Sequence, residues 1–115
     1  MALEGKCGVG ASTVIHGDFT LSADSTSITI PTIVGKNNVV VTYASNYTVN
    51  SSNACVSFVS ASSGRIVRRG TLYYGNYSFV EDSNATGYNS STGTFSILQS
   101  SNEKFRSGIY EYTAW

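Results

Sequence analysis

The chain is poor in the residues on which most catalytic and metal sites depend. Its 115 residues include one His, one Pro, one Trp and two Cys. Charged residues make up only 12%, against a usual share of roughly 25%. The formal net charge is zero, which gives no general attraction to nucleic acid or to an anionic membrane. No stretch approaches the roughly 20 apolar residues of a membrane span. We therefore expect no nucleic-acid partner and no membrane insertion.

The two cysteines form no metal or redox motif. Cys7 and Cys55 lie far apart, and neither belongs to a C-x-x-C pair. The beginning, "MALEGKCGVGASTV", has no apolar run of secretory length and fits no phosphate-binding glycine motif. These features favour a protein made in a reducing cytosol, with free thiols and a flexible N-terminal arm over residues 1–12. A removed leader would reverse this interpretation. Glycans would then be expected at the Asn-x-Ser/Thr sites, which are Asn46, Asn50, Asn76, Asn84 and Asn89.

Candidates for catalysis are few. His16 is the only histidine, and Asp18 falls on the same face of an alternating stretch, about 7 Å away in a strand, which is too far for a dyad. We therefore expect His16 on a solvent-facing surface. The acidic candidates for a sugar-hydrolysing pair are Glu81, Asp82, Glu103 and Glu111. Glu81 and Asp82 would face opposite ways, and a pair formed across strands leaves no pattern in a sequence. We expect a protein that is not an enzyme and has no cofactor.

Two further motifs suggest binding but are incomplete. "DSNATG" places Asp82, Asn84 and Thr86 in the spacing of a calcium loop, but Gly93 occupies the position of its last acidic ligand. An Asx-rich loop without metal is the better interpretation. In "RIVRRG", alternation puts Arg65 and Arg69 on one face, which could hold a phosphate. Because the net charge is zero, a solvated or edge-protecting strand is favoured.

The apolar pattern is that of strands. No window shows the i, i+3, i+4, i+7 repeat of an amphipathic helix, whereas alternation is common. We expect about eight or nine short strands in an antiparallel β-sandwich or jelly roll, forming a single domain over residues 1–115. The candidate strands are 14–23, 26–31, 38–44, 54–60, 65–69, 71–74, 77–81, 94–99 and 107–114. Residues 81–93, "EDSNATGYNSSTG", are predicted to form a long loop.

The apolar face of each alternating stretch predicts the core. The predicted core residues are Ile15, Phe19, Leu21, Ile28, Ile30, Val39, Val41, Val56 and Phe58. Pro31 cannot donate to a strand ladder, so the strand with Ile28 and Ile30 should end there or lie at an edge. Gly35 then turns the chain into the valine-rich stretch that follows. The segment 27–44 is predicted to be a hairpin or a corner.

Tyrosine gives the best indication of function. The chain has eight, and Tyr73, Tyr74, Tyr77 and Tyr88 surround the predicted long loop. Tyrosine offers a large contact area and stacks on sugars and on protein surfaces. These residues are therefore candidates for binding a partner protein or a glycan, although strand-rich proteins also use tyrosine structurally. Tyr73, Tyr74 and Tyr77 are the candidates for a self-association interface.

Two stretches carry a resemblance to a known class of proteins. "SITIPTIVGKNNVVV" (27–41) and "FRSGIYEYTAW" (105–115) resemble segments of small structural proteins in the tail, baseplate and fibre modules of tailed bacteriophages. The resemblance implies a virion-associated module, made in the host cytoplasm, that assembles as a homo-oligomer such as a trimer. Other phage structural proteins and host-surface glycans would be its partners. The alternative is a carbohydrate-binding module of a secreted protein.

Overall fold

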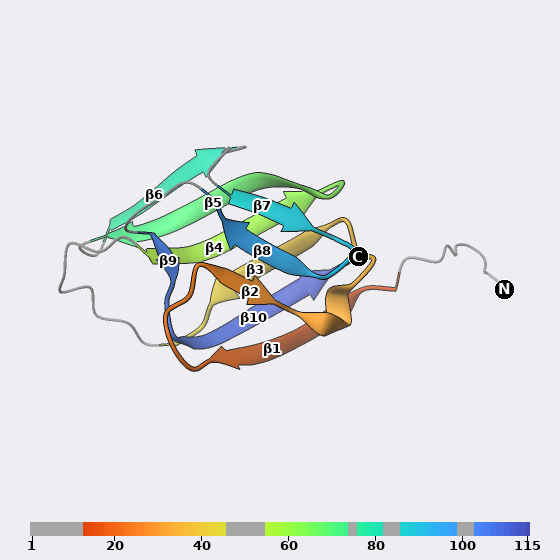
Figure 1. Ribbon diagram of the computed structural model, residues 1–115, viewed down its shortest axis with the longest axis horizontal. Helices are drawn as coiled ribbons and strands as arrows, with labels where there is room; N and C mark the ends of the chain where they lie inside the picture. Colours follow the sequence, from red (N-terminus) through yellow and green to blue (C-terminus); the bar gives the residue numbers. More distant parts are fainter. Residues whose placement is uncertain (1–12, 46–54, 74–75, 82–85, 99–102) are drawn as a thin grey trace, which may run out of the picture.

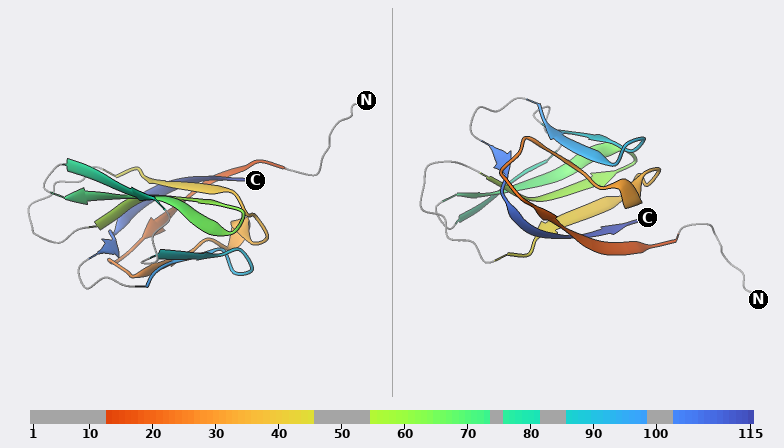
Figure 2. Two further views of the ribbon diagram at one scale, coloured as in Figure 1. Left: turned by 90° about the horizontal axis from the view of Figure 1, so that it is seen from above. Right: turned by 60° about the horizontal axis from the view of Figure 1, so that its bottom comes forward.

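The structure is a computed structural model that describes residues 13–45, 55–73, 76–81, 86–98 and 103–115, with the backbone alone at 55, 71–73 and 76–81. Within these residues the fold is all-β, as the alternation predicts. A seven-stranded sheet and a three-stranded sheet pack face to face in a sandwich-like arrangement (Figure 1). Figure 2 shows the two layers from further directions.

The strands follow a simple spatial order. The large sheet contains β1 (Ile15–Leu21), β10 (Gly108–Ala114), β3 (Val39–Tyr43), β4 (Cys55–Ser62), β5 (Arg65–Tyr73) and β6 (Asn76–Glu81), with β9 (Lys104–Phe105) beside β4. The small sheet contains β2 (Ser27–Thr29), β8 (Thr94–Ile97) and β7 (Thr86–Asn89). Among the described strands only the β4–β9 pair is parallel. In Figure 1, β1 and β6 form the two margins of the large sheet, and the small sheet lies in front of the strands between them.

The middle of the chain differs from the predicted strands. Gly70 does not end a strand, because β5 continues through it. The predicted loop 81–93 contains β7, which forms a hairpin with β8. The hairpin turn is built on Asn89, whose carbonyl accepts a bond from the Gly93 N–H at 2.9 Å, and Gly93 adopts φ 70°. The abundance of Asn, Ser and Gly thus predicts the turn correctly, but the same composition gives no sign of the short strand β7 that precedes the turn.

The segment 27–44 is a corner between the two sheets. β2 ends before Pro31, which begins a 3-10 turn, η2 (Pro31–Ile33). Gly35, with φ 85°, then leads the chain into β3 of the large sheet. The corner is anchored where the Ile30 N–H donates to the Gly93 carbonyl at 2.9 Å. Of the two predicted alternatives, the structure confirms the corner.

Most of the predicted core is confirmed. Five of the predicted residues are buried, namely Ile28, Ile30, Val39, Val41 and Val56. Three others, Ile15, Phe19 and Leu21, pack against the core but remain half-buried. These three lie on β1, which pairs with only one of the other described strands. Their partial exposure follows from this edge position.

Two β-bulges correct the predictions that assumed unbroken alternation. Val56 pairs with Thr71 while Phe58 pairs with Gly70, so Ser57 is an extra residue in β4. Phe58 consequently leaves the inner face and is half-buried outside the core. A second register shift, between Ser60 and Ala61, makes Val67 an extra residue in β5. This shift turns the Arg69 side chain inward.

An aromatic cluster fills the inner face of β1, β10 and β3. Phe19 stacks on Tyr110 with ring centroids 5.1 Å apart, and Tyr43 meets Tyr110 edge-on at 5.2 Å. The Tyr112 ring covers Gly17, its register partner on β1. A Cβ at Gly17 would lie 2.5 Å from Cζ of Tyr112, closer than any real contact. Gly17 is therefore required by the packing of Tyr112.

Replacing Gly17 with Ala should lower the free energy of unfolding by about 1 to 3 kcal/mol, because the added methyl group must displace Tyr112. Gly87→Ala is the matched control, since a Cβ at this strand glycine would lie an ordinary 3.4 Å from Cδ1 of Leu98. The control should change stability by no more than about 1 kcal/mol. Urea denaturation measures both, and equal effects of the two substitutions would contradict the role of Gly17.

Candidate functional site

Tyr88, a candidate for partner binding, lies mostly inside the protein. Tyr88 is 8% exposed and stacks on Phe95 with ring centroids 4.5 Å apart. Its hydroxyl donates to the Lys36 carbonyl at 2.6 Å. Both ends of the side chain are thus engaged inside the protein, and Tyr88 joins the small sheet to the start of β3. It leaves only a small part of its side chain exposed to a ligand.

The other predicted tyrosines lie beyond the described side chains. Tyr73 and Tyr77 belong to β5 and β6, where they lie near the hairpin that joins these strands. Their side chains, and Tyr74 as a whole, lie outside the described residues. Cys7 and the Cys55 side chain lie outside them too. The binding role of these tyrosines and the free state of the thiols remain predictions.

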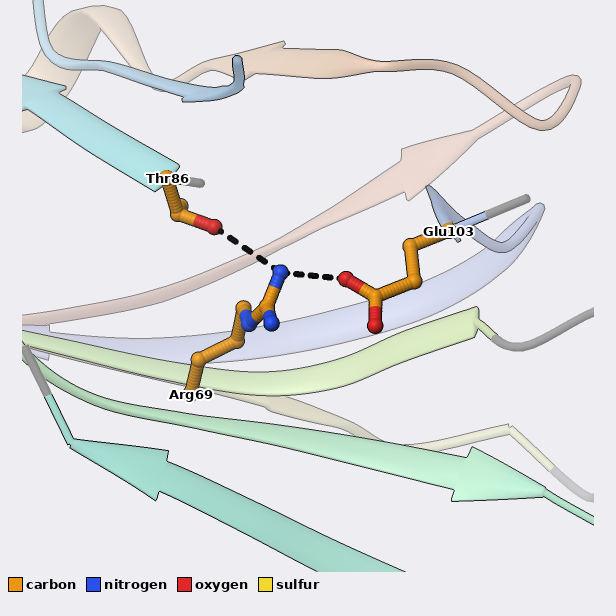
Figure 3. A network of polar contacts seen from close by, with 3 residues as sticks. All are labelled: Arg69, Thr86 and Glu103. Atoms are coloured by element: carbon orange, nitrogen blue, oxygen red, sulfur yellow. Dashed lines mark hydrogen bonds and ion pairs between the residues drawn. The ribbon is translucent and has the colours of Figure 1, made fainter. Parts of the chain in front are cut away.

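Arg69 is buried between the two sheets, contrary to the predicted solvated strand. The bulge at Val67 turns Arg69 inward, and its side chain is 6% exposed. Nη1 forms an ion pair with Oε1 of Glu103 and donates to Oγ1 of Thr86 at 3.3 Å (Figure 3). Arg69 belongs to the large sheet, Thr86 to the small sheet, and Glu103 precedes β9. The network therefore ties three segments together and is not a phosphate site open to solvent.

The end of the incomplete calcium-loop motif "DSNATG" forms a strand and not a loop. Thr86 and Gly87 belong to β7, and the Thr86 hydroxyl is directed toward Arg69. Asp82 and Asn84 lie outside the described residues. In the part of the chain that the structure describes, no three His, Cys, Asp or Glu side chains come together in a way that could hold a metal ion.

A shallow depression lies on the outer face of the large sheet. It has a volume of about 520 Å³ and crosses β1, β10 and β3. Its lining residues are His16, Gly17, Asp18, Val40, Thr42, Glu111, Tyr112 and Thr113. His16 is exposed, as predicted, and its Nδ1 lies 3.0 Å from the Thr113 hydroxyl. The sheet thus presents hydroxyl, imidazole and carboxylate groups side by side on one face.

Two carboxylates face each other in this depression. Asp18 on β1 and Glu111 on β10 are register partners, and both are exposed. Directly opposed residues have Cβ atoms about 5 Å apart, and like charges at this separation repel each other. No cation of the described residues forms an ion pair with either one. The sequence predicts Glu111 as an acidic candidate but does not predict Asp18 as its partner. Only the pairing of β1 with β10, from opposite ends of the chain, brings Asp18 beside it.

Apolar side chains flank the depression along β10. Burial alternates along this strand, so Ile109 and Trp115 point to the same outer side as Glu111 and Thr113. Ile109 is 48% exposed and Trp115 43%. Trp115 extends the ladder beyond β10, since its N–H donates to the Asn38 carbonyl at 2.9 Å. The outer face therefore combines polar groups with one half-exposed indole on a fixed backbone.

Comparisons with known proteins identify no relative of this chain, since no family model, no curated protein and no solved structure matches it. Among the described residues, no helix has the length and apolar character to cross a membrane.

Removal of the Glu103 carboxylate should destabilise the fold. Glu103→Ala leaves the buried Arg69 charge without its counterion, and we expect a loss of about 2 to 4 kcal/mol. Nε of Arg69 has no hydrogen-bond partner among the described residues, so the pair is not a fully satisfied network. The double variant R69M/E103A should therefore recover to within about 1 kcal/mol of the wild type. Urea denaturation tests this, and equal losses in the single and double variants would contradict it.

The buried Tyr88 should make stability fall at alkaline pH. Burial raises the pKa of the Tyr88 hydroxyl above the free value of 10.0. The unfolded chain therefore loses this proton first, so the stabilising contribution is complete below pH 10.0 and is lost as the pH rises above it.

The Tyr88→Phe variant isolates this effect. It removes the hydrogen bond to Lys36 and should cost about 1 kcal/mol at neutral pH. Its unfolding free energy should decline less than that of the wild type between about pH 9 and about pH 11. Urea unfolding across this range measures the difference, and parallel declines would show that Tyr88 titrates equally in both states.

Proposed function

We propose that this chain is a non-enzymatic binding and assembly module of a bacteriophage particle, and that it binds its ligand through the outer face of the large sheet. The depression on that face carries the proposal, because it gathers Asp18, Glu111 and Thr113 on adjacent strands. The phage setting rests on the resemblance of 27–41 and 105–115 to tail and fibre proteins. Such modules act by assembly and adhesion.

The environment of the carboxylates favours binding over hydrolysis. Glycoside hydrolysis needs one carboxyl group that stays protonated, which proteins achieve with an apolar, water-excluding surrounding. Asp18 and Glu111 are both exposed to solvent in an open depression. Glu103, the other described acidic candidate, forms an ion pair with Arg69. A carboxylate pair in water is better suited to accept hydrogen bonds from a ligand than to transfer protons to it.

The chemistry of the face supports a ligand rich in hydroxyl groups. Carboxylates and threonine hydroxyls accept and exchange hydrogen bonds with sugar hydroxyls. The half-exposed indole of Trp115, beside Thr113, offers an apolar surface on which a sugar ring can stack. The low overall charge fits a neutral ligand better than a polyanion. A glycan of the host surface is the ligand that we propose.

The alternative is a carbohydrate-binding module of a secreted protein, and the same face supports it. The two settings share the ligand chemistry and differ in where the protein is found. Mass spectrometry of purified particles from a culture that produces the phage separates them. Recovery of the chain in stoichiometric amounts supports the virion module, and recovery only in the particle-free medium supports the secreted one.

Binding to an array of immobilised neutral, amino and acidic glycans tests the proposed ligand. We expect the chain to retain neutral glycans, and we expect Trp115→Ala and Glu111→Gln each to weaken binding about tenfold or more. Leu98→Ala is the matched control, because Leu98 is 63% exposed but follows β8 in the small sheet. Absence of binding to every glycan, or equal losses in all three variants, would overturn the proposal.

A further inference from the structure

The edge strand β1 offers a surface for a second copy of the chain. It has seven residues and forms an unbroken ladder with β10, and no other described strand pairs with its opposite side. The described edges of the small sheet, β2 and β7, are much shorter. β1 has no Pro, Lys or bulge, which are the usual means of preventing edge-to-edge pairing. Its inward side chains Ile15, Phe19 and Leu21 remain half-buried.

The free hydrogen-bonding groups of β1 can be assigned. The Trp115 and Asn38 backbones bond to each other, and the Ala44 N–H donates to the Ile109 carbonyl. In an antiparallel sheet the backbone groups of successive residues point to opposite sides of a strand. The even-numbered residues of β10 therefore bond to the odd-numbered residues of β1. It follows that the N–H and C=O groups of Val14, His16, Asp18 and Thr20 point away from the sheet.

From these observations we propose that two copies of the chain pair antiparallel through β1, with Gly17 facing Gly17 of the second copy across a two-fold axis. This inference deepens the assembly part of the proposed function, and it does not depend on what the outer face binds. The pairing joins the free groups in about eight main-chain hydrogen bonds. It also places Ile15 opposite the second copy's Phe19, so that half-buried apolar side chains become covered.

Charge selects this register over its neighbours. In the proposed register His16 lies opposite the second copy's Asp18, twice, on the outer face. A shift that centres the axis on Asp18 would oppose two carboxylates, and a shift that centres it on His16 would oppose two imidazoles. Asp18 already faces Glu111 without a described cation. The second copy's imidazole supplies the missing donor, because Nδ1 of His16 is taken by Thr113 while no described residue engages Nε2.

The pairing also has a consequence for the ligand face. A two-fold axis perpendicular to the joined sheet leaves both outer faces on the same side. The two depressions then lie next to each other across the β1 pair. One dimer would present two copies of the depression to a surface that carries many identical glycans, which strengthens attachment through the high local concentration of the second site.

Sedimentation equilibrium of the full chain tests the proposal. The wild type should approach a mass of twice the 12.2 kDa chain at tens of micromolar. His16→Asp opposes two acidic residues and Asp18→Lys opposes a base to His16, so each should weaken dimerisation about tenfold or more. The double variant H16D/D18K restores opposite charges and should return to within about threefold of the wild type. Circular dichroism confirms that each variant is folded.

Amide hydrogen exchange of the wild type gives an independent measurement. The amides of His16, Asp18 and Thr20 should become protected as the protein concentration rises, whereas those of Gly17 and Phe19 should be protected at every concentration. A monomer at all concentrations overturns the proposal, as does a dimer whose even-numbered β1 amides stay unprotected. A dimer that the double variant does not restore overturns the register. A monomer that still binds glycans rejects the pairing alone, and a dimer that binds none rejects the ligand alone.

Discussion

A three-stranded sheet cannot cover a seven-stranded one, and this mismatch determines where each kind of side chain lies. Between the two sheets, burial is nearly complete, as for Val39 and Val41 of β3 and Phe95 of β8. Toward the margins of the large sheet the cover ends (Figure 1). At β5 a buried ion pair spans the boundary, whereas at β1 the apolar side chains stay half-exposed. Polar contacts within the chain thus close the space beside β5, whereas at the β1 margin the described residues leave part of the apolar surface uncovered.

The boundary of the covered region explains how the chain uses its tyrosines. Rings of Tyr43, Tyr88 and Tyr110 enter the core or its rim, while each hydroxyl reaches a main-chain carbonyl. The acceptors are Ser107, Lys36 and Arg106 respectively, at 2.7, 2.6 and 2.6 Å. A phenol suits this position because its ring replaces missing cover and its hydroxyl satisfies a carbonyl outside the strand ladders. High tyrosine content therefore indicates a wide core boundary in this fold as much as it indicates a binding surface.

Alternation predicted the fold class and most of the core because burial on one face repeats every second residue, as at Ile28 and Ile30. The prediction failed where a bulge reverses which face the following side chains point to. No residue type in the sequence indicates the bulges at Ser57 and Val67. Unbroken alternation therefore predicts Phe58 in the core and Arg69 in the solvent, whereas in the structure Phe58 lies half-buried outside the core and Arg69 is buried. The candidate site was less predictable, since it depends on which strands become neighbours. His16 was expected at the surface, but only the β1–β10 pairing brings Asp18 to Glu111.

The inner and outer faces of β1 and β10 are linked through the same residues. Gly17 lacks a side chain so that Tyr112 can cover it from within, and the same glycine leaves no side chain in the middle of β1. Its neighbours His16 and Asp18 must then point outward, one beside Thr113 and the other against Glu111. The packing of Tyr112 over Gly17 on the inner face thus fixes the positions of His16 and Asp18 on the outer face. Polar groups whose positions are set by core packing need little further ordering when a ligand binds, which lowers the entropic cost of binding.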